Sequence, residues 1–239
     1  MRTLVQRLRR LPAWLQGGLG GALLLGVAVV SLQGIERTAR ASDQVEKLYY
    51  PSGRFLREGT VGYREIVADF LWFRTVQYYG AYRKGDHDLR YFSGLVDAVT
   101  TLDPQFIEAY YFGSLVASMD QDQIPRAIDL LKRGILANPD NWLLPFQIGF
   151  NHYILSQDYE RAAAWFAIAA RCPEATDFAR RFAAFSRQRA GNLEGSIALW
   201  RNLYETTSNP AMRDLALKMI GQCEEQLQQQ AGGLPKESL

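Results

Sequence analysis

The 239-residue chain is poor in the side chains that carry catalytic chemistry or cross-links. It has two cysteines, Cys172 and Cys223, and two histidines, His87 and His152. So few thiols exclude a disulfide scaffold and a structural zinc cluster, and two histidines leave few ligands for any other metal. The sequence has no glycine-rich phosphate loop, no CxxC, no HExxH and no nucleophile elbow. We therefore expect no catalytic residues, no metal site and no cofactor, and we expect that the protein is not an enzyme.

An excess of charge of one sign is also missing. The 27 basic and 25 acidic residues leave a net charge of +2, and no stripe of lysine and arginine appears beyond the first ten residues. A nucleic-acid partner therefore gets little support. The content of 48% hydrophobic and 22% charged residues is ordinary for a globular protein and argues against a disordered or polytopic membrane chain.

One uncharged run stands out near the N-terminus. The 22 residues from Trp14 to Ile35 contain no charge, and a helix of this length spans about 33 Å at about 1.5 Å per residue. Four arginines and no acid precede the run, whereas the charges that follow it balance. The positive-inside rule therefore predicts a single-pass anchor at 14–35 in the inner (cytoplasmic) membrane, a cytoplasmic segment at 1–13 and a periplasmic or otherwise extracytoplasmic remainder.

A cleaved signal peptide is the alternative interpretation of this run. Ala39 and Ala41 offer a small-residue cleavage site before Ser42. The apolar run is longer than the usual core of a signal peptide, about 7–15 residues, and the site lies well downstream of it. We favour the anchor.

The rest of the chain contains an internal repeat. Trios of residues at offsets of four and three begin at positions 92, 127, 162 and 196, which are 35, 35 and 34 residues apart. These offsets place each trio on one face of a helix, and a proline follows where that helix must have ended. A polar turn precedes each trio, and a helical stretch with a small residue precedes each turn. The small residues are Gly80, Ser114, Gly149 and Ala184, and the prolines are Pro104, Pro139, Pro173 and Pro210.

This pattern resembles the tetratricopeptide repeat (TPR) family, whose 34-residue helix pairs carry small residues at set positions and a proline near the end. The resemblance covers roughly residues 70–210 and is strongest over 107–173, where Asp158-Tyr159-Glu160-Arg161-Ala162 and Asn138-Pro139-Asp140 match the family pattern closely. It implies an all-α, right-handed superhelical solenoid of about four helix pairs over 61–210. An apolar stripe in the following segment predicts a capping helix at 211–230, and the polar residues 231–239 predict a flexible tail.

A segment rich in aromatic residues precedes the repeats, and two interpretations of it stay open. Residues 49–92 include 12 aromatics, and the stretch Phe70-Leu71-Trp72-Phe73 makes a predicted helix apolar nearly all round, after a linker and lead-in at 36–60. One interpretation is the core of the first helix pair. The other is a docking patch for a partner or for the membrane surface, formed by Tyr50, Phe70, Trp72 and Phe73.

The family resemblance also implies a use. TPR arrays are binding scaffolds whose concave groove, lined mostly by the first helix of each pair, receives a peptide or helix. Counting back from the trios, in a register open by one residue, the predicted groove residues are Gln77, Tyr111, Gln147, Asn151, Arg181, Phe185 and Gln188. The amides suit the backbone of an extended peptide, and Arg181 suits an acidic group on it.

The predicted function is therefore a membrane-anchored scaffold or adaptor that binds protein partners in the cell envelope and supports assembly of a larger complex. Two alternatives stay open: a permanent structural subunit of a membrane complex, and a secreted or cytosol-facing TPR receptor. The stacking order also predicts that Cys172 and Cys223, about one and a half repeats apart, are free thiols.

Overall fold

A computed structural model describes residues 56–232 with the exception of residues 57, 61, 86 and 87. The described residues all belong to one compact unit, Tyr50–Leu239. The predicted cytoplasmic segment at 1–13, the predicted anchor at 14–35, most of the lead-in at 36–60 and nearly all of the tail lie outside them. Within the described part of the chain, no helix combines the length and the apolar character needed to cross a bilayer.

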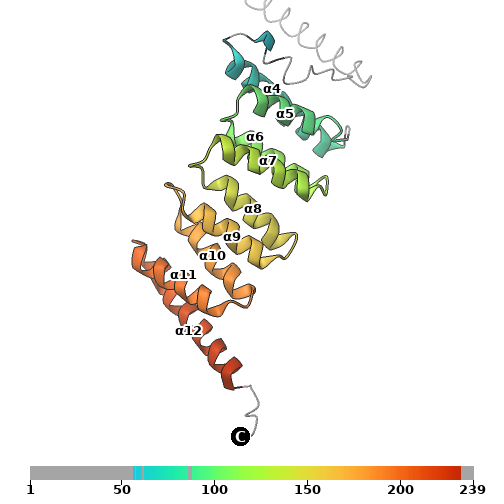
Figure 1. Ribbon diagram of the computed structural model, residues 1–239. Helices are drawn as coiled ribbons and strands as arrows, with labels where there is room; N and C mark the ends of the chain where they lie inside the picture. The colour runs from blue at the N-terminus through green and yellow to red at the C-terminus, as the bar shows by residue number, and fades with distance from the viewer. Residues whose placement is uncertain (1–55, 57, 61, 86–87, 233–239) are drawn as a thin grey trace, which may run out of the picture. The chain divides into compact units, whose positions relative to one another are not determined.

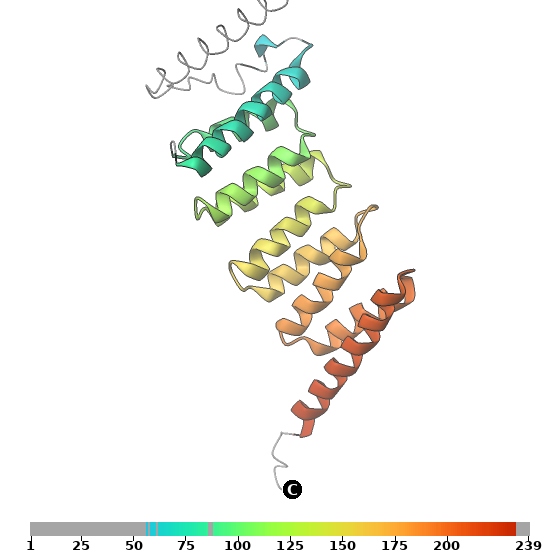
Figure 2. The same cartoon turned by 180° about the vertical axis from the view of Figure 1, so that it is seen from behind.

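The described residues are all-helical, and they contain no strand (Figure 1). The helices are α4 (Arg64–Lys84), α5 (Phe92–Leu102), α6 (Ile107–Met119), α7 (Ile124–Ala137), α8 (Leu143–Ile154), α9 (Tyr159–Ala170), α10 (Asp177–Arg189), α11 (Leu193–Thr206) and α12 (Pro210–Gly232). Each packs against the next along the chain, and α6 also contacts α8. Figures 1 and 2 show the helices following one another in chain order, which is consistent with the predicted all-α solenoid.

The turns inside successive helix pairs repeat one backbone conformation. Asp122, Gln157 and Gly191 all have positive φ angles, of 51°, 51° and 81°, and they are 35 and 34 residues apart. After the last two of these turns, the side chains of Asp158 and Asn192 cap α9 and α11 by accepting hydrogen bonds from backbone N–H groups of the first helical turn. The 34- or 35-residue period of the sequence pattern therefore corresponds to the period of these turns along the backbone.

Two substitutions in these turns test whether positions 157 and 191 adopt the left-handed conformation. We expect Gly191→Ala to lower the free energy of unfolding by about 1 kcal/mol, because a Cβ disfavours the left-handed region. A Cβ on Gly191 would meet no atom within 4 Å, so steric contact adds nothing. We expect Gln157→Gly to raise the free energy of unfolding by about 0.5–1 kcal/mol for the same reason. Urea titration measures both changes, and shifts of the same sign would contradict the assignment.

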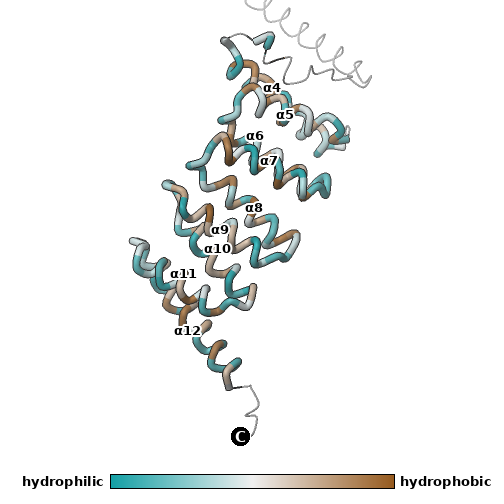
Figure 3. Tube along the Cα trace, in the orientation of Figure 1, coloured by the Kyte–Doolittle hydropathy of each residue, from teal (hydrophilic) through white to brown (hydrophobic). Residues whose placement is uncertain are grey.

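The hydrophobic core is a series of clusters, each shared by neighbouring helices. One cluster joins α5 to α8, a second joins α4 to α6, a third joins α8 to α10, and a fourth joins α10 to α12. Phe92, Phe166 and Trp200, which all belong to the repeating trios, are buried. Figure 3 shows apolar and polar residues interleaved along the helices, as expected when each helix buries only part of its surface. Each helix thus depends on its near neighbours for stability.

Cys172 and Cys223 are both free thiols, as the stacking order predicts. Cys172 follows α9 and approaches the backbone oxygen of Pro139, with a sulfur–oxygen distance of 3.9 Å. Cys223 lies inside α12 and packs with Leu193 and Ile197 of α11.

Candidate protein-binding surface

Aromatic side chains gather where α8, α9 and α10 meet. The ring of Phe146 on α8 lies 4.9 Å from that of Phe166 on α9, and 5.1 and 5.5 Å from those of Phe178 and Phe182 on α10. Trp142 and Tyr153 extend this group along α8. We call the six rings the α8–α10 aromatic cluster; its members are Trp142, Phe146, Tyr153, Phe166, Phe178 and Phe182.

The cluster has a buried base and an exposed rim. Phe146 and Phe166 are buried, whereas Phe178 is 42% exposed and Phe182 is half-buried. Ring pairs in this distance range are stabilising beyond the area that they bury. Rigid aromatic residues that keep an accessible edge are typical of the centres of protein interfaces. The rim of the cluster is therefore a candidate contact surface.

Arg181 lies over this rim. Its guanidinium carbon is 5.0 Å from the centre of the Phe178 ring and 5.8 Å from that of Phe182. Its buried Nε has no hydrogen-bond acceptor among the described residues. The neighbouring Arg180, by contrast, forms an ion pair with Asp177 at 3.1 Å. A guanidinium close to aromatic ring faces can also bind a carboxylate through its N–H groups.

Three of the predicted groove residues share one face of α10. Arg181, Phe185 and Gln188 are four and three residues apart, which places them on the same side of the helix. The ring of Phe185 packs edge-on against Trp200 at 5.0 Å. The side-chain amide of Gln188 donates a hydrogen bond to that of Gln226 on α12, at 3.3 Å. The structure therefore brings this part of the predicted set together.

The predicted groove residues on α8 lie elsewhere. Gln147 and Asn151 are only 3% and 1% exposed, and the amide nitrogen of Gln147 donates to the amide oxygen of Asn151 at 3.2 Å. They are packed between helices and do not line an open surface. Phe146, one residue earlier than Gln147, is also buried, and it contacts α10. Tyr111 on α6 is half-buried against the cluster that joins α5 to α8, and Gln77 on α4 is exposed.

The predicted aromatic docking patch is divided between two faces of α4. Trp72 points into the protein, with its ring centre 5.4 Å from that of Phe106 and 5.8 Å from that of Phe112. Phe70 and Phe73 are exposed. Tyr50 lies outside the described residues. The helix therefore contributes to the core of the first pair and also presents an apolar outer face.

Comparison with known proteins assigns no family. No protein-family model matches the chain, and no curated protein matches it. The function has to be argued from the chain's own surfaces.

The sequence prediction missed Phe178 and Phe182, although a signal for them was present. Together with Phe185 they stand at spacings of four and three in the helix Asp177–Arg189, so they form an aromatic stripe on one side of α10. Counting back from the trios selects single positions and overlooks such a stripe.

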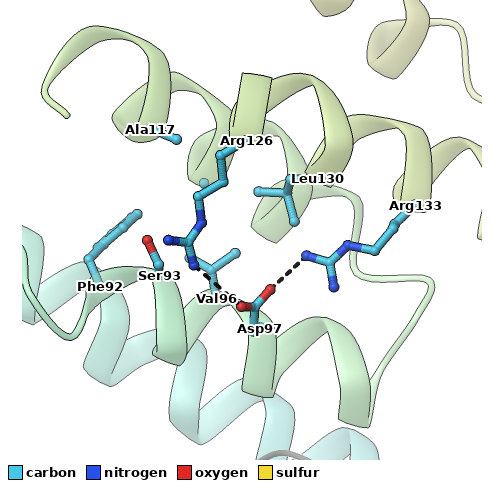
Figure 4. Close-up of a pocket in the computed structure, with 9 residues that line it drawn as sticks. Phe92, Ser93, Val96, Asp97, Ala117, Arg126, Leu130 and Arg133 are labelled. Carbon is cyan, nitrogen blue, oxygen red and sulfur yellow. Dashed lines mark hydrogen bonds and ion pairs between the residues drawn. The ribbon is translucent and has the colours of Figure 1, made fainter. Parts of the chain in front are cut away.

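A small hollow lies between α5, α6 and α7. Figure 4 shows Asp97 between two arginines; its carboxylate lies 2.6 Å from Arg133 and 3.6 Å from Arg126. The free volume is about 20 Å³, room for roughly one water molecule. The three charged groups are half-exposed, so their pairing contributes at most about 1 kcal/mol. We assign this hollow no ligand.

His152 is buried in the last turn of α8. Burial lowers the pKa of His152 below its ordinary value, while the carboxylate of Asp158 opposes this shift and the charges of Arg161 and Lys132 add to it. Its Nδ1 has no hydrogen-bond partner among the described residues. No group of three potential metal ligands occurs in the part of the chain that the structure describes.

The lowered pKa of His152 predicts a pH-dependent stability. Below the ordinary value of 6.5, the unfolded chain binds a proton that the folded protein resists. The stability that comes from a neutral His152 is thus fully present above pH 6.5 and is lost as the pH falls through the lowered pKa. We expect the free energy of unfolding to fall between pH 7 and pH 5, and His152→Gln to reduce that fall. Denaturant titrations at several pH values measure it, and an unchanged slope in the variant would contradict the assignment.

Proposed function

We propose that this protein is a membrane-anchored, TPR-like scaffold that binds protein or peptide partners through the α8–α10 aromatic cluster and Arg181. The scaffold supports assembly of a larger complex in the cell envelope. The observation that carries the binding role is Arg181, whose guanidinium lies over two partly exposed rings.

Recurring contacts support a TPR-like array. Positive-φ turns and helix caps recur at 34 or 35 residues. Contacts between neighbouring units recur as well: the amide of Asn138 donates to the oxygen of Pro104, and the sulfur of Cys172 approaches the oxygen of Pro139, across 34 and 33 residues. A repeat in which each unit meets the next in the same way is the basis of a solenoid.

The chemistry of the surface favours one class of partner. The aromatic rim suits an apolar side chain, and Arg181 suits a carboxylate placed beside it. The partner is thus an acidic segment that also carries an apolar anchor, on a client protein or as a peptide.

The membrane part of the proposal rests on the uncharged run at 14–35 and on the arginines before it. It puts the N-terminus in the cytoplasm and the helices α4 to α12 on the far side of the inner membrane. Protease added to spheroplasts would then digest these helices. Digestion only after lysis would instead support a cytosol-facing receptor.

We expect Arg181→Ala to weaken binding of an acidic, aromatic peptide by about 10- to 100-fold, because a hydrogen bond to a charged group contributes about 1.5–3 kcal/mol. Fluorescence anisotropy with the full-length protein in detergent, using peptides that differ only in acidic against neutral residues, measures this change.

Arg201→Ala is the matched control for that experiment, because Arg201 is an exposed arginine on α11 that pairs with Glu224. It should leave the affinity unchanged. Equal losses in the two variants would indicate a general charge effect and would contradict a specific role for Arg181. Purification with one partner in fixed stoichiometry would favour a permanent structural subunit.

A further inference from the structure

Helix α4 has a second apolar face that no described residue covers. Its inner face carries the buried residues Ala68, Leu71 and Thr75, of which Ala68 and Leu71 pack in the cluster shared with α5 and α6. On the opposite side, five large side chains are between 43% and 67% exposed. They are Tyr63, Ile66, Phe70, Phe73 and Val76, and we call them the α4 outer stripe.

The stripe differs from the other exposed apolar residues of the molecule. Elsewhere among the described residues, large exposed hydrophobic side chains occur singly, as with Met119 and Leu136, or as the adjacent pair Ile154 and Leu155. Scattered residues of that kind are normal on protein surfaces, whereas a row along a single helix is typical of an interaction site. Spacings of three and four residues keep this row on one side of the helix.

We infer that the α4 outer stripe docks on the surface of the lipid bilayer that holds the predicted anchor, so the inference rests on the anchor of the proposed function. Aromatic and branched apolar side chains are favoured at the membrane–water interface, where an apolar helix face is buried at the headgroup level. Lys84, exposed in the last turn of α4, suits a lipid phosphate, whereas the neighbouring Arg83 pairs with Asp120 at 3.9 Å. Glu65 lies beside the stripe, and Asp69, three residues after Ile66 and four before Phe73, lies within it. These two exposed carboxylates limit how deeply the helix can enter the bilayer.

The length of the preceding chain selects the membrane as the occupant. The uncharged run ends at Ile35, and 27 residues separate it from Tyr63. A chain of that length reaches at most about 95 Å even when fully extended. An anchored chain therefore keeps the stripe within that distance of the bilayer and raises its effective concentration there, without any further partner.

Spin labels on the full-length protein in phosphatidylethanolamine–phosphatidylglycerol vesicles test this inference. A Cys172→Ser background leaves only the buried Cys223 thiol, and one label is added through Phe73→Cys on the stripe. A second protein carries Leu136→Cys on α7, where the native side chain is 84% exposed. A third carries Leu24→Cys inside the predicted anchor. Power saturation compares accessibility to oxygen, which concentrates in lipid, with accessibility to a water-soluble nickel chelate.

We expect the label at 73 to show a higher ratio of oxygen to nickel accessibility than the label at 136. Low accessibility to both reagents at 73 would mean that protein, either a second copy or the chain's own N-terminal segment, covers the stripe. A ratio of oxygen to nickel accessibility equal to that at 136 would mean that the stripe faces water. Either result overturns the inference. The label at 24 separates the two proposals, because its lipid signature supports the anchor whatever position 73 shows, and its absence refutes the anchor.

Discussion

Phe166→Ala is expected to lower the free energy of unfolding by about 3–5 kcal/mol, the usual range when a large buried aromatic residue is removed. Phe166 is fully buried, and its ring lies 4.9, 5.3 and 6.4 Å from those of Phe146, Phe182 and Tyr153. The substitution would leave a cavity at the base of the α8–α10 aromatic cluster. Chemical denaturation followed by far-UV circular dichroism measures the loss.

Leu136→Ala is the control for this loss, because the Leu136 side chain is 84% exposed. It should change stability by no more than about 0.5 kcal/mol. If Phe166→Ala changed the free energy of unfolding by as little as Leu136→Ala does, the packing of α8, α9 and α10 would not depend on this ring. Since the rim of the cluster rests on Phe166, we also expect the variant to bind the acidic, aromatic peptide more weakly than Leu136→Ala does.

Gly149→Ala is also expected to lower the free energy of unfolding, in this case because it adds side-chain volume to the core. A Cβ at this position would lie 2.7 Å from Cδ1 and 2.8 Å from Cε1 of the Phe166 ring. Overpacking of this kind lowers stability by about 1–3 kcal/mol, against a gain of up to about 1 kcal/mol from the better helix propensity of alanine. Thermal or urea denaturation of the variant gives the net change.

Gly80→Ala separates the two contributions. Gly80 has the same phase in its predicted repeat, it lies within a helix, and a Cβ there would meet nothing within 4 Å. It should therefore show the propensity gain alone, and the difference between the two variants measures the overpacking. Combining Gly149→Ala with Phe166→Leu should recover part of the loss, because the smaller side chain gives the new methyl group room. If the stability changes of the two single variants simply added in the double variant, the contact between position 149 and the ring of Phe166 would be contradicted.

The close approach of helices within a pair could be predicted from the sequence, because it depends on small and large residues at fixed offsets. Gly149 meets Phe166 as the repeat requires, and the backbone oxygen of Ala184 accepts a hydrogen bond from Ser196, a residue of the last trio. Gly80 departs from this rule, since no side chain fills the space beside it. Spacing alone cannot reveal this departure, because it depends on how α4 and α5 meet in the first pair.

The rotation of each first helix about its own axis could not be predicted in the same way. Gln147 and Asn151 were placed by counting, but burial of Phe146 against α10 turns both amides into the interior, where they bond each other. Similarly, the run from Phe70 to Phe73 is apolar on all sides, so its pattern could not show that Trp72 points inward while Phe70 and Phe73 point outward. Contacts with other helices decide both cases.

Helix α12 controls the chemical reactivity of one thiol. Cys223 is fully buried and its sulfur lies 3.7 Å from the hydroxyl oxygen of Ser196 on α11. A thiol reagent in solution can reach it only when α12 separates from α11, so its labelling kinetics measure how often the C-terminal end of the array opens. Because the clusters are shared only between near neighbours, such opening can occur while the surface around Arg181 stays folded. The array thus contains its own reporter of local unfolding at the end farthest in sequence from the predicted anchor.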